Sequence, residues 1–219
     1  MVAPVKKTFP LIPAIIICLV IGFLISSALY AVTGLSIFGK FREKPLSTVD
    51  TGNADLCALA YRVLGDINNG DYEALSRVAH PVHGVLFSPQ ATVDKSTNKQ
   101  FSVAEIAAFG TDTHSYVWGI DTACGEPIEM TPDEFFAKFI SYKDYSTAPI
   151  IGVNHIVRSG NALENITDVF PDSQFVEFHI PGVEQDPTCD FDWYTLRLGF
   201  EEYDGSLWLS VIVHSEWSE

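Results

Sequence analysis

The hydrophobic residues of this chain fall into two distinct patterns. Residues 11–32 form an unbroken apolar run without a charged side chain. About 20 apolar residues in a helix cross a hydrocarbon core of ~30 Å. Further along, apolar and polar positions alternate with the periods of helices and strands. The pattern predicts four parts: a basic N-terminal tail at 1–10, a transmembrane signal-anchor helix at 11–33, a linker at 34–53 and one domain at 54–219.

Helical spacing and capping signals predict the helices of the domain. Apolar residues recur every three to four positions between 54 and 67, and a second short helix is expected at 72–79 before His80-Pro81. Two capping boxes, Ser102 to Glu105 and Thr131 to Glu134, predict helices at 103–109 and 132–141. Strands are expected at 84–88, 115–120, 150–156 and 174–180.

The C-terminal residues predict an antiparallel hairpin. Strands 193–203 and 206–217 alternate with period two around Asp204-Gly205, which is a strong two-residue turn signal. We expect an apolar face on which Leu196, Leu198 and Phe200 lie opposite Val213, Val211 and Leu209. The other face pairs Thr195 with His214, Arg197 with Ile212, Gly199 with Ser210, and Glu201 with Trp208.

The order of elements indicates an α+β domain. No βαβ repeat occurs, so a parallel sheet is not expected. We predict one curved antiparallel sheet that is covered by helices on one side. By element order alone, this arrangement resembles the cone-shaped fold of nuclear transport factor 2-like proteins.

Several short segments also carry a resemblance to a family. They are His80-Pro81, Gly84-Val85, Phe87-Ser88-Pro89, Trp118-Gly119, Gly125-Glu126-Pro127-Ile128, Phe135-Phe136, Gly160-Asn161 and the ending His214-x-x-Trp217. Together they resemble an uncharacterised family of secreted, often lipid-anchored proteins of Gram-positive bacteria, over about residues 60–217. The resemblance implies an exported location and the extent of the domain, but no activity. Ile17 stands before Cys18 where a lipid acceptor needs a small residue, so a transmembrane anchor is expected instead of a lipid. Cys124 follows Ala123 where the family suggests small polar residues or glycine.

Charge separates the leader from the domain and limits the possible partners. Residues 1–44 carry five basic groups and one acidic group, whereas residues 45–219 carry eight basic and 27 acidic groups, a net charge of −19. No basic stripe is present, so nucleic-acid binding is not expected.

Location rests on the predicted span. Lys6 and Lys7 precede it and three basic residues follow it, so charge bias does not set the orientation. We expect an extracytoplasmic domain on a cell membrane, because domains behind an N-terminal signal-anchor usually translocate. Ser26-Ser27-Ala28 also fits signal peptidase, which leaves cleavage after Ala28 as the alternative.

A polar face of the sheet is the principal candidate site. Arg197 could hold a carboxylate or phosphate there, and His214 or His179 could act with Glu177 or Glu201 as acid and base. Trp193 and Ser210 complete the expected ligand-binding face, and Trp118 is a further candidate in a loop of acidic and aromatic residues. The alternatives are a solvated face, or an internal network of Arg197 with Glu201 or Glu177.

Other chemistry has weaker signals. His80-x-x-His83 contains Pro81, which breaks the helix that would present both rings to a metal, so neither a metal nor a cofactor is expected. His80 would instead cap a helix end. Cys57, Cys124 and Cys189 permit at most one internal disulfide, or three buried thiols.

The sequence therefore supports three functional hypotheses. The first is a membrane-anchored domain that binds a small ligand or an envelope protein partner without catalysis. The second is a hydrolase or isomerase with a His/Glu pair in the sheet pocket, although no nucleophile elbow, phosphate loop or nucleotide fingerprint supports it. The third is an accessory subunit of a membrane complex that is contacted through the span.

Overall fold

A computed structural model describes residues 51–217, apart from residue 122 and residues 183–191. The expected span, the cleavage site at Ala28 and Cys189 lie outside these residues. Within the part that is described, no helix is long and apolar enough to cross a membrane. Cys57 and Cys124 are free thiols.

The helices begin largely where the sequence predicts. Ser102 and Thr131 each form a complete capping box at the start of α4 (Val103–Ala108) and α5 (Pro132–Phe135). The predicted helix 132–141 is not α-helical throughout, because α5 continues as one π-helical turn, η2 (Phe136–Ile140). The described residues also contain the helices α2 (Thr51–Asn68), α3 (Tyr72–Ser76) and α6 (Ile166–Val169), and the 3₁₀ turns η1 (Phe109–Thr111) and η3 (Tyr145–Thr147).

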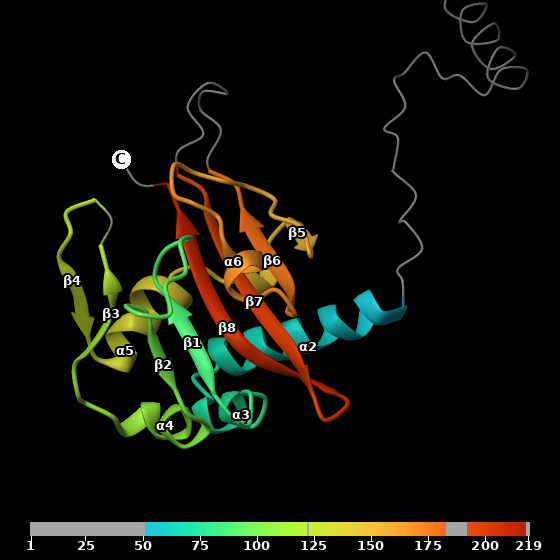
Figure 1. Ribbon diagram of the computed structural model, residues 1–219, viewed down its shortest axis with the longest axis horizontal. Coiled ribbons are helices and arrows are strands. Elements are labelled where there is room, and N and C mark those ends of the chain that lie inside the picture. Colours follow the sequence, from blue (N-terminus) through green and yellow to red (C-terminus); the bar gives the residue numbers. More distant parts are fainter. Residues whose placement is uncertain (1–50, 122, 183–191, 218–219) are drawn as a thin grey trace, which may run out of the picture. The chain divides into compact units, whose positions relative to one another are not determined.

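The described residues form two sheets. The larger has the order β2-β1-β8-β7-β6-β5, and β3 (Tyr116–Ile120) pairs with β4 (Pro127–Met130) in a second sheet. Figure 1 shows β7 and β8 as long bent strands with α2 running across them. The strands of the larger sheet are β1 (Val85–Ser88), β2 (Lys99–Phe101), β5 (Ile150–Val153), β6 (Gln174–Ile180), β7 (Tyr194–Tyr203) and β8 (Ser206–Glu216).

The larger sheet is mixed and not purely antiparallel. β1 runs parallel to β8, with Leu86 opposite Val211 and Phe87 opposite Ile212. The prediction of an antiparallel sheet is therefore wrong for this pair, although the α+β class is confirmed. The segment that separates the two strands in sequence contains most of the helices. It thus provides the long crossover that a parallel pair requires.

A β-bulge changes the predicted register of the hairpin. Asp204 and Gly205 both have positive φ, as the predicted turn requires, and Phe200 pairs with Leu209. Beyond that pair Gly199 faces Val211, so Ser210 is the extra residue of β8. A Cβ atom at Gly199 would lie 2.5 Å from Cγ1 of Val211, so glycine accommodates the close approach.

The bulge decides which side chains of β8 enter which core. Because a one-residue shift inverts the faces, Ile212 joins the main core whereas Val211 and Val213 join a second cluster. The main core lies between the sheet and helices α2 to α5, and it includes Phe87, Phe101, Trp118 and Phe135. The second cluster is covered by α6 and includes Phe170 and Phe175.

Candidate functional site

Arg197 lies in a closed ionic network. Its side chain and that of Glu177 are fully buried. Nε of Arg197 donates to Glu177, and Nη1 donates to Glu164. The other oxygen of Glu177 accepts the backbone N–H groups of Val157 at 3.1 Å and Arg158 at 3.3 Å. Burial raises the pKa of the Glu177 carboxyl, and Arg197 opposes this effect. The guanidinium is thus paired within the domain. This agrees with the predicted alternative of an internal network between Arg197 and Glu177.

His179 and Trp193 lie near this network at the far end of the same sheet face. His179 pairs with Thr195, and its ring centroid lies 6.0 Å from the Trp193 ring. Both side chains are buried. Gly160 provides the surface on which Trp193 rests, since a Cβ atom there would lie 3.2 Å from the indole. His179 and Trp193 therefore lie in the interior of the domain and do not line an open groove.

The other predicted residues are not brought together on that face. His214 pairs with Leu196 and so lies on the opposite, helix-covered face, because of the bulge at Ser210. Glu201 lies toward the hairpin turn and contacts His83, with 3.1 Å between Oε2 and Nε2. The prediction that His214 shares one polar face with His179, Glu177 and Arg197 is wrong, because it assumed a hairpin without the bulge at Ser210.

Trp118 belongs to the core. It is fully buried and stacks on Phe135 with 3.7 Å between ring centroids. Its indole N–H donates to the carbonyl oxygen of Met130 at 2.9 Å. The side chain therefore joins the small sheet to α5 and is not available to a ligand.

The His80-x-x-His83 motif organises a turn. Nδ1 of His80 accepts the backbone N–H of Val82 at 3.2 Å, so this ring is not a cationic helix cap as predicted; α3 ends earlier, at Ser76. The rings of His80 and His83 stack with 3.6 Å between centroids. Burial, together with the nearby His83, lowers the pKa of His80. Among the described residues, no group of three or more His, Cys, Asp or Glu side chains could hold a metal ion.

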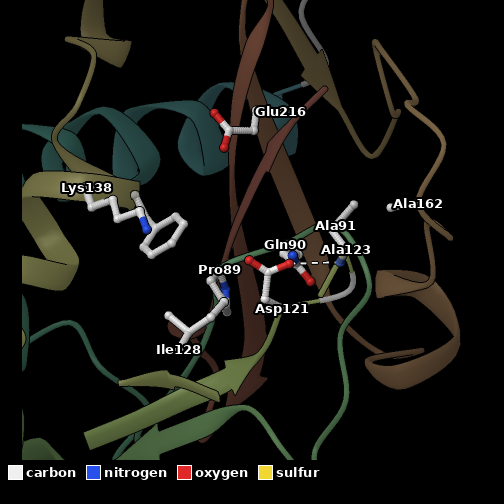
Figure 2. Close-up of a pocket in the computed structure, with 10 residues that line it drawn as sticks. Pro89, Gln90, Ala91, Asp121, Ala123, Ile128, Lys138, Ala162 and Glu216 are labelled. Carbon is white, nitrogen blue, oxygen red and sulfur yellow. Dashed lines mark hydrogen bonds between the residues drawn. The ribbon is translucent and has the colours of Figure 1, made fainter. Parts of the chain in front are cut away.

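A cavity lies on the helix-covered side, where four segments of the chain and the end of β8 meet. It has a volume of about 160 Å³. Figure 2 shows its lining side chains around one space, including Glu216 from β8, Lys138 from η2 and Asp121 after β3. The rest of the lining consists of Gln90 and the mostly apolar Pro89, Ala91, Ala123, Ile128, Phe139 and Ala162.

The three charged side chains of the cavity differ in their surroundings. Asp121 accepts the backbone N–H of Ala123 at 2.8 Å, the bond that is dashed in Figure 2. Nζ of Lys138 lies 4.9 Å from the centroid of the Phe139 ring. Partial burial raises the pKa of Glu216, and Lys138 opposes this effect. Within the described residues, no ion pair of 4.0 Å or less involves Asp121, Lys138 or Glu216.

The π-helical turn presents Lys138 and Phe139 to the cavity. The backbone N–H of Ser141 donates to the carbonyl oxygen of Phe136 at 2.6 Å, which closes a turn wider than that of an α-helix. Such turns are rare in proteins overall, but those that occur often lie at functional sites. Here the wide turn lies beside two residues that line the cavity.

His214 lies behind the cavity wall and contacts two of the lining residues. Its Nδ1 is 3.1 Å from the carbonyl oxygen of Pro89, and its ring centroid is 5.5 Å from that of Phe139. Burial lowers the pKa of His214 to about 4, although the bond to Pro89 opposes the shift. The imidazole is therefore neutral at pH 7. Since a carbonyl only accepts, Nδ1 carries the proton.

Sequence reasoning missed most of this cavity. Asp121 lies in the loop of acidic and aromatic residues that contains Trp118, and Glu216 lies within the predicted strand 206–217. Nothing in the local sequence marks Lys138, because the capped helix gives no sign of a π-turn. The one available signal was Gly199, since a glycine inside a strand indicates a bulge. That bulge sets the face of β8 from which Glu216 projects.

Comparisons with known proteins do not assign a family. No protein-family model and no curated protein matches the chain. One similar solved structure is described as a calcium/calmodulin dependent protein kinase II association domain from Xanthomonas campestris. It shares 11% identity over 78% of this chain and 92% of that chain, with a TM-score of 0.36. The resemblance to secreted proteins of Gram-positive bacteria stays a prediction.

Proposed function

We propose that the domain binds a small ligand in the cavity that is lined by Asp121, Lys138 and Glu216. The observation that carries the proposal is the cavity itself, whose lining combines apolar side chains with three charged ones. None of the three charged side chains has an ion-pair partner among the described residues. Ligand sites typically combine apolar walls with a few polar groups in this way. The π-turn beside Lys138 and the buried His214 behind the wall are consistent with a site of defined shape.

The proposal includes the location and the type of fold. The span at 11–33 would anchor the protein in a cell membrane with the domain outside the cytoplasm, where the ligand or an envelope partner is found. We also propose that the fold is nuclear transport factor 2-like. Its support is the bent sheet with helices α2 to α5 against one face, and the cavity on that same side.

The two alternative functions have less support. A hydrolase or isomerase would need a histidine and a carboxylate within reach of a ligand. However, Glu177 is committed to Arg197, and His214 is separated from His179 by the thickness of the sheet. No contact in the described chain bears on an accessory subunit, so that hypothesis stays a prediction.

Ligand-observed NMR with a library of small polar compounds tests the proposal on the full chain in detergent micelles. Ala162→Trp places a large side chain at the cavity and should abolish binding of any true cavity ligand. Ala107→Trp, at an exposed position of α4, is the matched control and should bind as the wild type does. Equal binding by both variants, or no binding by the wild-type protein, contradicts the proposal.

A further inference from the structure

We infer that the cavity selects a small zwitterion, with an ammonium group held by Asp121 and Glu216 and a carboxylate held by Lys138. This inference rests on the proposed function, because it names the ligand class of the same cavity. It uses three observations: the cavity's volume, the signs of its charges and its apolar wall.

The volume restricts the ligand to a compact molecule. An apolar cavity of about 150 Å³ accommodates benzene, and the volume here is about 160 Å³. Nucleotides, oligosaccharides and peptides are therefore too large to be enclosed. A ligand of roughly the size of a small amino acid fits this space.

The charges favour a ligand that carries both signs. Lys138 and Glu216 are exposed and Asp121 is half-buried, so a ligand that displaces water from them must offer partners to the charged groups that lose hydration. Lys138 and Glu216 already interact with each other, but an amine alone would offer no partner to Lys138, and an acid alone would offer none to Asp121 and Glu216. A zwitterion offers a partner to all three.

The arrangement of signs also assigns the ends of the ligand. An ammonium group has three N–H donors and no acceptor, so it matches the two carboxylates. Lys138 supplies only donors, so it matches the ligand carboxylate. Glu216 has Lys138 as a positive neighbour, which opposes the rise in its pKa, and a bound ammonium group would add a second one. Ile128 and Phe139 then face the apolar part of the molecule.

Isothermal titration calorimetry with three related probes tests the inference on the full chain in micelles. The probes are L-valine, isobutylamine, which lacks the carboxylate, and 2-hydroxyisovalerate, in which a hydroxyl replaces the ammonium group. We expect L-valine to bind at least tenfold more tightly than either analogue. Glu216→Gln should weaken L-valine at least tenfold, and Lys138→Met should make L-valine and isobutylamine bind equally.

Matched controls separate this inference from the proposed function. Lys143→Met removes a lysine that lies over Tyr142 and does not line the cavity, so it should leave all three affinities unchanged. If isobutylamine binds the wild type as well as L-valine does, or if only 2-hydroxyisovalerate binds, the zwitterion assignment is overturned. The proposed function survives that result provided that Ala162→Trp still abolishes binding. If none of the three probes binds while another library compound does, the assignment is again overturned alone. If no compound of any kind binds, both are overturned.

Discussion

Acidification should weaken the fold through His214. In the folded domain burial lowers the pKa of this imidazole from 6.5 to about 4, whereas the unfolded chain exposes it to water. Between these pH values the unfolded state binds one more proton than the folded state. Stability is therefore complete above about pH 6.5 and declines by about 1.4 kcal/mol per pH unit as the pH falls. The total loss near pH 4 is about 3 kcal/mol.

Urea unfolding of the full chain in micelles, followed by tryptophan fluorescence at several pH values from 7.5 to 4, measures this loss. His214→Phe keeps an aromatic ring next to Phe139 but cannot titrate. Buried carboxyls such as Glu177 have raised pKa values, which act in the opposite direction. Because wild type and variant share them, the difference between the two pH profiles isolates His214.

The free energy of unfolding of the wild type, measured relative to that of His214→Phe, should fall by about 3 kcal/mol between pH 7 and pH 4. The reason is that only the wild type loses stability to protonation of residue 214. Nitrogen-15 NMR of the imidazole gives an independent readout and should show it neutral at pH 6. Parallel pH profiles, or an imidazole that titrates near pH 6.5 in the folded protein, would refute the reasoning.

Three further predictions concern the ionic network, a strained turn and the membrane topology. Arg197→Met should lower the free energy of unfolding by about 3–5 kcal/mol, since it leaves buried carboxylates unpaired; Arg77→Met, which removes an exposed helix pair, should cost about 0.5 kcal/mol or less in the same urea titration. Gly84→Ala should lower the free energy of unfolding by more than about 1 kcal/mol, because φ is +72° and the new Cβ would overlap a carbonyl of β2. Gly65→Ala in α2 meets no atom and should raise the free energy of unfolding by about 0.5–1 kcal/mol. Thermal unfolding of the two variants measures both changes. A membrane-impermeant maleimide should label the exposed thiol of Cys124 in intact cells, and labelling only after lysis would place the domain inside.

The features that the sequence predicted correctly depend on neighbouring residues. Ser102 and Thr131 cap their helices because each side chain and its own N3 glutamate complete a local hydrogen-bond cycle. Asp204-Gly205 forms the hairpin turn because both residues tolerate positive φ. Strand β6 has the predicted limits. In these cases the residues that determine the structure lie within a few positions of one another.

The candidate site was predicted less well, because one residue changed its geometry. Period-two alternation assigned His214 and Arg197 to a common face of the sheet. The bulge at Ser210 moved His214 to the helix-covered face instead, where it packs against Phe139. In the alternative register, Val211 would enter the main core in place of Ile212. Both are apolar and β-branched, so the sequence did not distinguish the two registers beyond Gly199.

The helix starts, the hairpin turn, the α+β class and the division between an apolar leader and an acidic domain can all be predicted from the amino-acid sequence. The parallel pairing of β1 with β8, the ion pairs of Arg197 with Glu164 and Glu177, and the cavity become apparent only in the folded domain. The two groups differ in the sequence separation of the interacting residues. Caps and turns satisfy the hydrogen bonds of adjacent residues, whereas the cavity joins Asp121, Glu216 and η2 across long stretches of chain. Their proximity depends on how the whole core packs.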